Sequence, residues 1–208
     1  MDYPMPRAAL LLLTLLNLPL TAQAGSATAV FAGGCFWCME SDYEALDGVS
    51  SVVSGFTGGT LPNPTYSGNH QGHVEAVEVT YDPDVVSYAQ LLDLFWHSID
   101  PFDNKGQFCD KGASYRSAIF PGDATERALA EASKTAVAER FRDHTVYTEI
   151  QDAGTFWPVE EYHQDYYLKN PIRYKYYRWN CGRDQRLQEI WGDEAGTFRE
   201  EPQLEIQS

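Results

Sequence analysis

The hydrophobic pattern of the chain indicates short strands interspersed with helices. Strands are expected where short runs rich in β-branched or small apolar residues are bounded by turn-forming residues. Five segments have this pattern: 28–32, 49–56, 74–81, 116–120 and 146–150. Side chains at every second position of a strand share a face, so residues 75, 77 and 79 are expected on one face, the buried one, with Glu78 opposite them in solvent.

Helices are expected over 39–46, 87–97 and 123–141. The second and third begin with capping-box patterns, Ser87-x-x-Gln90 and Asp123-x-x-Glu126, in which each end residue bonds the backbone of the other. The second helix has an apolar face that is suited to a core, made of Leu91, Leu92, Phe95 and Trp96.

The order of these elements predicts the fold class. Strands and helices do not alternate strictly, so we expect an α+β fold, a single domain with a mixed β-sheet and flanking helices. Two loops, 57–73 and 100–115, are longer than usual connections, and such loops in a compact domain are usually functional. The aromatic-rich stretch 160–179 starts an extended C-terminal segment.

The two ends of the chain carry different signals. Residues 1–24 predict a secretory signal peptide, with Arg7, an apolar run over 8–20 and an Ala-x-Ala site that places cleavage after Ala24. An uncleaved anchor is the alternative, but that run is about 13 residues, short of the ~20 that a membrane span needs. We therefore expect an exported protein, in a periplasm-like compartment, with no membrane association after cleavage. Residues 25–192 are expected to form the domain, and the acidic stretch 193–208 a flexible tail.

The composition of the chain argues against some classes of function. A formal net charge of −15 argues against nucleic-acid binding, because phosphate contacts need a basic surface. Hydrophobic residues make up 43% and charged residues 22% of the chain, as in an ordinary globular protein. Four cysteines are too few for a disulfide scaffold of this length. A monomer is the default expectation.

The segment Gly33-Gly34-Cys35-Phe36-Trp37-Cys38 carries the clearest chemistry. The two glycines permit a sharp turn from strand to helix, which places Cys35 at a helix N-terminus. The free N–H groups and the helix dipole there stabilise a thiolate and lower the pKa of the thiol. Cys35 is therefore a candidate nucleophile. Cys38 lies one helical turn away, where a disulfide to Cys35 is geometrically plausible.

Other interpretations of a C-x-x-C pair stay open at this point. The pair could be half of a zinc site, completed by His70-x-x-His73, although glycines flank that second pair. It could also be a thioredoxin-like redox pair or a structural disulfide of an exported protein. A catalytic thiol is the interpretation that we favour.

Further motifs point to a family. The segment Gly34-Cys35-Phe36-Trp37 followed by Met39-Glu40 resembles the signature of A-type peptide methionine sulfoxide reductases. Four more motifs resemble the same family, in the same order: Gly58-Gly59 with Asn63-Pro64-Thr65-Tyr66, Gly72-His73-Val74-Glu75-Ala76-Val77, Asp110-x-Gly112 with Tyr115-Arg116-Ser117, and Glu161-Tyr162-His163-Gln164-Asp165-Tyr166. The resemblance spans residues 33 to about 182.

The resemblance implies a mixed sheet with flanking helices, a ferredoxin-like αβ sandwich. It implies reduction of the S epimer of methionine sulfoxide, free or in oxidised proteins, and hence protein repair after oxidation. A thioredoxin-type protein is the implied electron donor, and neither a bound cofactor nor a metal is expected.

Reduction of a sulfoxide needs a thiolate to attack sulfur, an acid to protonate the oxygen, an apolar pocket for the methyl group and a second thiol. Cys35 fits the first role, and the resemblance places Phe36 and Trp37 in the methyl pocket. It selects Glu75 as the acid, and burial would raise the pKa of that carboxyl.

The two long loops supply the other expected substrate-binding residues. Tyr66 and Tyr115 hold positions that, in the family, hydrogen-bond the sulfoxide oxygen and orient the substrate. Asp110 lies close to Tyr115 in sequence and is included with them.

The second thiol has two candidates, Cys38 and Cys181. Many members of the family have glycine where Cys38 stands and recycle through a C-terminal cysteine. Cys181 must swing in to reach Cys35, whereas Cys38 needs only a local rearrangement, so we favour Cys38. A relay through both cysteines is also open. Cys109 is a third candidate, and we expect it to be a packed thiol.

Two functions of other classes compete with the reductase. A thiol–disulfide oxidoreductase or chaperone would use Cys35 and Cys38 and would not need Glu75. A non-catalytic secreted module would hold its four cysteines in two disulfides and have no free thiol.

Overall fold

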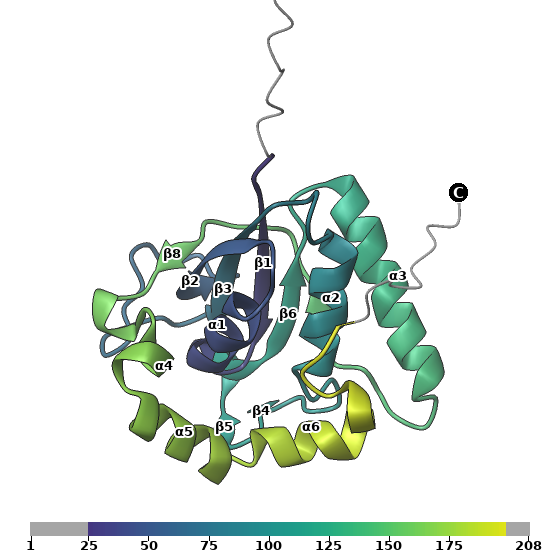
Figure 1. Ribbon diagram of the computed structural model, residues 1–208. Helices are drawn as coiled ribbons and strands as arrows, with labels where there is room; N and C mark the ends of the chain where they lie inside the picture. The colour runs from purple at the N-terminus through teal and green to yellow at the C-terminus, as the bar shows by residue number, and fades with distance from the viewer. Residues whose placement is uncertain (1–24, 199–208) are drawn as a thin grey trace, which may run out of the picture.

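The computed structural model describes residues 25–198. The predicted signal peptide, residues 1–24, lies outside the described residues, as does the stretch 199–208. The described part of the chain is one α+β domain in which helices flank a central sheet (Figure 1). This architecture confirms the expected fold class.

The sheet has six strands in the order β7-β6-β1-β3-β2-β8 (Figure 1). Neighbouring strands are antiparallel except β6 and β7, which are parallel, so the sheet is mixed. The strands span Ala27–Gly33 (β1), Val49–Thr57 (β2), Val74–Tyr81 (β3), Ser117–Phe120 (β6), Glu149–Ile150 (β7) and Trp157–Pro158 (β8).

Six α-helices are described: α1 (Phe36–Glu44), α2 (Tyr88–His97), α3 (Ala124–Arg140), α4 (Tyr166–Lys169), α5 (Pro171–Asn180) and α6 (Arg183–Trp191). The 3₁₀ segments are η1 (Ala113–Tyr115), η2 (Glu161–His163) and η3 (Gly192–Glu194). A separate two-stranded hairpin consists of β4 (Gly106–Gln107) and β5 (Asp110–Lys111).

The main core lies between the sheet and two helices. Phe31 of β1 is fully buried, and its ring stacks on Tyr43 of α1 at 5.3 Å and on Tyr88 and Phe95 of α2 at 5.9 and 5.5 Å between centroids. The helix α3 lies behind α2, where the indole N–H of Trp96 donates to the Ser133 hydroxyl over 2.9 Å. Since β1 runs directly into α1, this packing fixes the turn that joins them.

Strand β3 is buried on both faces over its first half. Val77 and Val79 belong to the main core, while Val74 and Ala76 belong to a smaller cluster on the other face, which Phe156 covers. Glu75 shares the face of Val77 and Val79 and is 2% exposed, whereas Glu78 is only half-buried. The predicted burial of Glu75 is therefore confirmed.

The capping predictions are confirmed in full for one helix and in half for another. At α2, the Ser87 hydroxyl accepts from the Gln90 N–H over 3.2 Å and the Gln90 side chain accepts from the Ser87 N–H over 2.9 Å. At α3, the Asp123 carboxylate accepts from the Glu126 N–H over 2.8 Å. The Glu126 carboxylate, however, accepts from the N–H of Gly122, one residue before the cap.

The chain from residue 100 onward differs most from expectation. The segment 146–150 forms a strand only at its last two residues, and the expected loop 100–115 contains the β4–β5 hairpin. Residues 193–198, which we expected to belong to the flexible tail, lie against α2 instead. The N–H of Gly196 donates to the carbonyl oxygen of His97 over 2.9 Å, and Ala195 and Phe198 pack on the core.

Among the helices that the structure describes, none combines the length and the apolar composition needed to cross a bilayer.

Candidate active site

Cys35 occupies the turn between β1 and α1 and is the N-cap residue of that helix. Gly34 makes the turn with a φ of 85°, and a Cβ at this position would lie 2.5 Å from the Gln107 Cβ. Only glycine fits both the conformation and the space. The predicted placement of Cys35 at a helix N-terminus is thus confirmed.

A small cavity of about 50 Å³ lies beside Cys35. One water occupies roughly 30 Å³ of the liquid, so the cavity has room for a group of about the size of a methyl. Its lining unites residues from both long loops, β3, the start of α1 and α5: Cys35, Phe36, Trp37, Tyr66, Glu75, Asp110, Tyr115 and Tyr177. The first seven were expected site residues. Of the other two, Cys38 lies buried beside Cys35, and Cys181 does not line the cavity.

The carboxyl group of Glu75, on strand β3, lines this cavity. Its Oε2 accepts a hydrogen bond from the backbone N–H of Phe36 over 3.1 Å, which ties β3 to the first turn of α1. Burial raises the pKa of Glu75 to about 8, and that hydrogen bond opposes the rise only in part. Near neutral pH the carboxyl group therefore holds a proton that it can donate.

The tyrosines on the cavity wall keep their protons as well. Burial raises the pKa of Tyr66 to about 12, and the negative charge of Glu75 adds to the rise. Burial likewise raises the pKa of Tyr115 well above its usual value. Both phenols are therefore hydrogen-bond donors throughout the physiological range.

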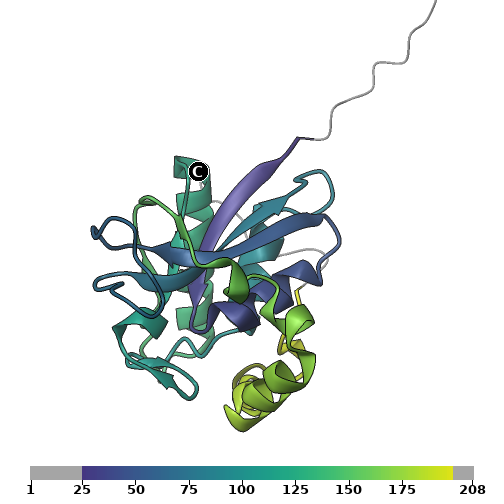
Figure 2. The same ribbon diagram turned by 90° about the vertical axis from the view of Figure 1, so that its left-hand side faces the viewer.

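The C-terminal segment closes the cavity over α1. The indole N–H of Trp37 donates to Nδ1 of His163 over 3.1 Å, and its ring stacks on Tyr166 with centroids 3.7 Å apart and planes 6° from parallel. Figure 2 shows the green segment that carries these residues lying against the dark blue helix α1. Burial lowers the pKa of His163, which keeps its ring neutral and able to accept this bond.

Tyr177 is a wall residue that the sequence did not single out. Its hydroxyl donates to Oδ2 of Asp110, so α5 and the β4–β5 hairpin meet at the cavity. Six tyrosines occur between residues 162 and 177, and nothing in their spacing distinguishes this one.

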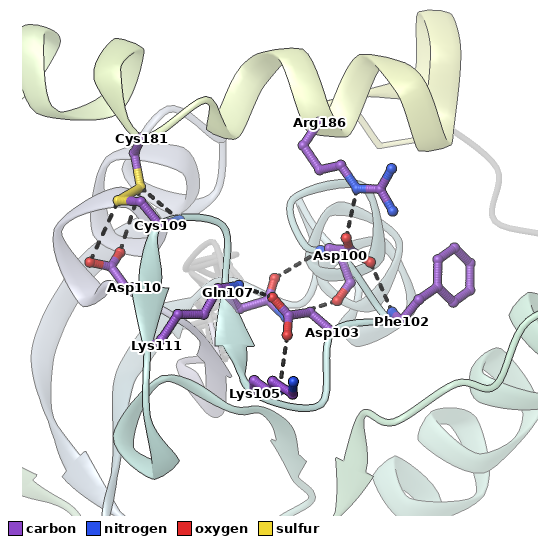
Figure 3. A network of polar contacts seen from close by, with 10 residues as sticks. All are labelled: Asp100, Phe102, Asp103, Lys105, Gln107, Cys109, Asp110, Lys111, Cys181 and Arg186. Atoms are coloured by element: carbon purple, nitrogen blue, oxygen red, sulfur yellow. Dashed lines mark hydrogen bonds and ion pairs between the residues drawn. A yellow bond between two sulfur atoms is a disulfide. The ribbon is translucent and has the colours of Figure 1, made fainter.

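The four cysteines form an inner pair and an outer pair. Cys35 and Cys38, the inner pair, are both buried free thiols. Cys109 and Cys181, the outer pair, are joined in a disulfide that links the turn of the β4–β5 hairpin to the C-terminal end of α5 (Figure 3). Cys109 is exposed, so our expectation of a packed free thiol there is wrong. Cys109 lies in the turn of the hairpin, where its side chain reaches Cys181 at the end of α5.

This pairing also bears on the competing functions. A module with two disulfides and no free thiol does not agree with the free inner pair. The zinc alternative fails at His73, because its Nδ1 accepts from the N–H of Gly59 over 3.3 Å and its Nε2 lies 2.8 Å from the carbonyl oxygen of Leu61. Both ring nitrogens are thereby engaged with backbone.

The charge of the inner pair is not distributed as the sequence suggested. Burial raises the pKa of Cys35 well above its usual value, contrary to the lowered pKa that its helix position predicts. A hydrogen bond from Cys35 lowers the pKa of Cys38, and the positive charges of Arg183 and Arg178 add to this effect. Of the two inner thiols, Cys38 is therefore the one that loses its proton more readily.

Comparison with known proteins places this site in a family. The family model of peptide methionine sulfoxide reductases matches residues 27–195. A peptide methionine sulfoxide reductase of Caulobacter vibrioides is 50% identical over 177 residues, which are 84% of this chain and 90% of that protein. The chain belongs to the peptide methionine sulfoxide reductase family. It is an oxidoreductase that reduces methionine sulfoxide.

Further relatives of this reductase agree in sequence and in fold. The peptide methionine sulfoxide reductase of Bacillus subtilis is 49% identical over 169 residues, 79% of this chain and 95% of its own length. The reduced form of Mxr1 from Saccharomyces cerevisiae aligns with a TM-score of 0.65 at 29% identity, over 72% of this chain and 88% of that one. Methionine sulfoxide reductase A of Corynebacterium diphtheriae aligns with 0.63 at 32% identity, over 74% and 79%.

Proposed function

We propose that this reductase acts on the S epimer of methionine sulfoxide, free or in oxidised proteins, and that Cys35 is the nucleophile. The observation that carries the proposal is the cavity of about 50 Å³ in which Cys35 faces the protonated carboxyl group of Glu75. A nucleophile and an acid on one methyl-sized space are what the reduction of a methyl sulfoxide requires.

In the reaction, Cys35 supplies an electron pair to the sulfur of the substrate while Glu75 protonates its oxygen. The sulfur–oxygen bond breaks, methionine leaves with its sulfur reduced, and the oxygen remains on Cys35 as a sulfenic acid. The hydroxyls of Tyr66 and Tyr115 donate hydrogen bonds to the oxygen and hold it against the acid.

Selection of one epimer follows from three fixed points around the substrate. The sulfur of Cys35, the carboxyl group of Glu75 and the apolar rings of Phe36 and Trp37 all line the cavity. The sulfoxide oxygen must face the acid and the methyl group must face the aromatic wall. Only one configuration at sulfur meets both conditions with the lone pair side open to Cys35, and we assign it to the S epimer.

We assign resolution of the sulfenic acid to Cys38. Both inner sulfurs are buried in the same turn of α1, whereas Cys181 is tied to Cys109 and lies outside the cavity. Attack by Cys38 on the Cys35 sulfenic acid expels the oxygen as water and leaves an inner disulfide.

The outer pair is suited to pass electrons inward. Its reduced form would attack the inner disulfide, and this exchange leaves the inner pair reduced and the outer pair oxidised, the distribution found in the structure. Cys109 is exposed, so a protein dithiol can reach the outer disulfide far more readily than the buried inner one. A thioredoxin-like reductant is the partner that we propose.

The compartment of this reductant follows from the N-terminal sequence. We propose that the chain is exported to a periplasm-like compartment and cleaved after Ala24, and that it works there as a monomer in protein repair. Its reductant must then be an exported thioredoxin-like protein. N-terminal sequencing of the protein from the periplasmic fraction tests this, and retention of Met1 would contradict it.

An assay with each epimer separately tests the activity. NADPH oxidation, coupled through thioredoxin reductase and thioredoxin, should be seen with the S epimer and not with the R epimer. Cys35→Ser should abolish it, while Cys109→Ser should still release one methionine per enzyme in the absence of reductant. Turnover of insulin disulfides without sulfoxide reduction, unaffected by Glu75→Gln, would instead support a general thiol–disulfide oxidoreductase.

A further inference from the structure

Arg183 is a buried cation beneath the catalytic turn. It is the first residue of α6, and its side chain is 1% exposed. Its Nη2 donates to the carbonyl oxygens of Gly33 and Ser98 over 3.2 and 2.8 Å and lies 3.3 Å from Sδ of Met39. The guanidinium group also lies 4.6 Å from the centre of the Phe108 ring. The group is thus fixed from several sides.

Within residues 25–198, Arg183 forms no ion pair. Two other arginines of the same region do: Arg178 pairs with Asp42 at 2.6 Å and Arg186 pairs with Asp100 at 2.7 Å. The Nε of Arg183 has no hydrogen-bond partner either. A buried charge without a counter-charge is strongly unfavourable, so an anion close to Arg183 is to be expected.

Two of the residues that Arg183 contacts lie just before Cys35 and just after Cys38 in the sequence. Gly33 precedes Cys35 by two residues, and Met39 directly follows Cys38. A Cβ on Gly34 would lie 3.9 Å from Nη1 of Arg183, so the guanidinium group reaches the residue that adjoins Cys35. It therefore lies against the first turn of α1, where the helix dipole also favours negative charge.

We infer that Arg183 is a positioning residue of the reaction, whose guanidinium group is the counter-charge of a single negative charge shared by Cys35 and Cys38. The inference rests on the proposed function and deepens it, because it states what keeps one inner thiol ionised before the substrate arrives. The direction of the Cys38 pKa, which the Arg183 charge lowers, agrees with it.

The shared charge then serves the reaction as follows. When the sulfoxide enters, the proton moves from Cys35 to Cys38, and the charge left on Cys35 supplies the electron pair that reduces the substrate. Glu75 gives its proton to the oxygen, which ends on Cys35 as the sulfenic acid. Cys38 loses its proton when it displaces that oxygen as water, and the negative charge is left on Glu75.

Other ionisable groups face the inner pair and must be considered with Arg183. The charge of Arg178 is offset by its pairing with Asp42. Those of Glu75 and Asp42 oppose ionisation of Cys35 and Cys38 respectively. Other titratable groups on this side of the fold are Asp110, Tyr66, Tyr115, Tyr174 and Tyr177. The charge of Arg183 also lowers the pKa of Asp110, but no ion pair joins the two residues in the described part of the chain, so the charge of Arg183 still acts on the thiols.

The test is a pH titration of the inner pair without substrate, in enzyme whose outer disulfide is intact. The ultraviolet absorbance of the thiolate monitors the titration. Arg183→Met should raise the midpoint of the first thiolate by about one pH unit or more, equivalent to about a tenfold loss of thiolate at neutral pH. Arg183→Lys should restore most of the shift. Arg186→Met, on the same helix, removes a paired and half-exposed charge and should leave the midpoint unchanged.

Single-turnover rates provide the second readout. In Arg183→Met the rate relative to the wild type should be low at neutral pH and should approach the wild-type rate at high pH, whereas a purely structural role would lower this ratio equally at every pH. Arg183→Gln, which can still donate to the carbonyl of Gly33, is a second neutral variant in case the Met variant does not fold. A wild-type midpoint in either folded neutral variant overturns the inference. Absence of methionine formation by the wild type would instead contradict the proposed function, and the thiolate titration would be unaffected.

Discussion

Replacement of Glu75 by glutamine separates the proton from the shape of this side chain. The glutamine Oε1 can still accept the N–H bond of Phe36, which spans 3.1 Å in the native protein, so β3 and α1 should stay joined. Only the transferable proton is lost. Glu78→Gln is the matched control, because it makes the same change three residues along β3, at a half-buried position outside the cavity.

The size of the effect follows from the pKa of Glu75, which burial raises to about 8. At pH 7 about nine in ten molecules then carry the proton. General-acid catalysis typically contributes about 10²- to 10⁴-fold, so the first-turnover rate of Glu75→Gln should fall by roughly that factor. The wild-type rate should decline as the pH rises through about 8, whereas the residual rate of the glutamine variant should show no loss at that pH.

The same pKa predicts an effect on stability. Between about 4.5, the ordinary value, and about 8, the folded state binds a proton that the unfolded state has released. The free energy of unfolding therefore falls as pH rises through this window, by up to about 5 kcal/mol at about 1.4 kcal/mol for each pKa unit. Glu75→Gln removes this dependence, so its stability relative to the wild type should be greater at pH 9 than at pH 5.

Rapid-quench measurement of methionine, with no reductant, reports the first chemical step, and urea unfolding at the two pH values reports the stability. A first-turnover rate of Glu75→Gln within threefold of the Glu78→Gln rate would refute the assignment of Glu75 as the acid. Equal stability differences at the two pH values would show that the carboxyl group titrates normally in the folded protein.

Three further variants test the cysteines. Cys35→Ser should show less than about one hundredth of the wild-type rate, because a neutral hydroxyl is a poor nucleophile, and methionine release measures it. Cys38→Ser should still release one methionine per enzyme, more slowly because serine does not take the proton of Cys35, but should lose steady-state turnover with thioredoxin, and normal recycling would contradict its role as the resolving thiol. Cys109→Ser should leave the inner disulfide to form on reaction with substrate, as peptide mapping detects, and should slow steady-state turnover. If the outer disulfide is only structural, the variant will lose thermal stability and recycle at the wild-type rate.

Local signals allowed much of the sheet and of the cavity to be predicted from sequence. β3 has the predicted bounds, and the Ser87 box caps α2 as expected, because both depend on residues next to one another in the chain. The alternation of side chains along β3 was enough to predict that Glu75 is buried. The resemblance in five short motifs then identified seven of the residues around the cavity.

The residues that were missed depend on contacts between distant parts of the chain. Tyr177 and Arg183 belong to helices α5 and α6, which are polar overall and were not expected as helices. Cys109 pairs with a residue 72 positions away, and no local pattern specifies that pairing. The raised pKa of Cys35 follows from the depth at which the packed aromatic side chains hold it, whereas its helix position alone suggests the opposite direction.

The stacking of Trp37 on Tyr166 has a consequence for the protein while it is being made. The wall that shields Cys35 comes from residues more than 120 positions later, since Trp37 and His163 are 126 residues apart. A chain emerges from its N-terminal end, so an incomplete molecule has made both inner cysteines before the segment that covers them. During that interval the inner pair lacks its cover and its buried arginine, and oxidants or other thiols can reach it. Completion of α5 and α6 ends this exposure. A chain that is truncated before Arg183 should therefore be isolated as oxidised, cross-linked protein and not as an enzyme with reduced activity.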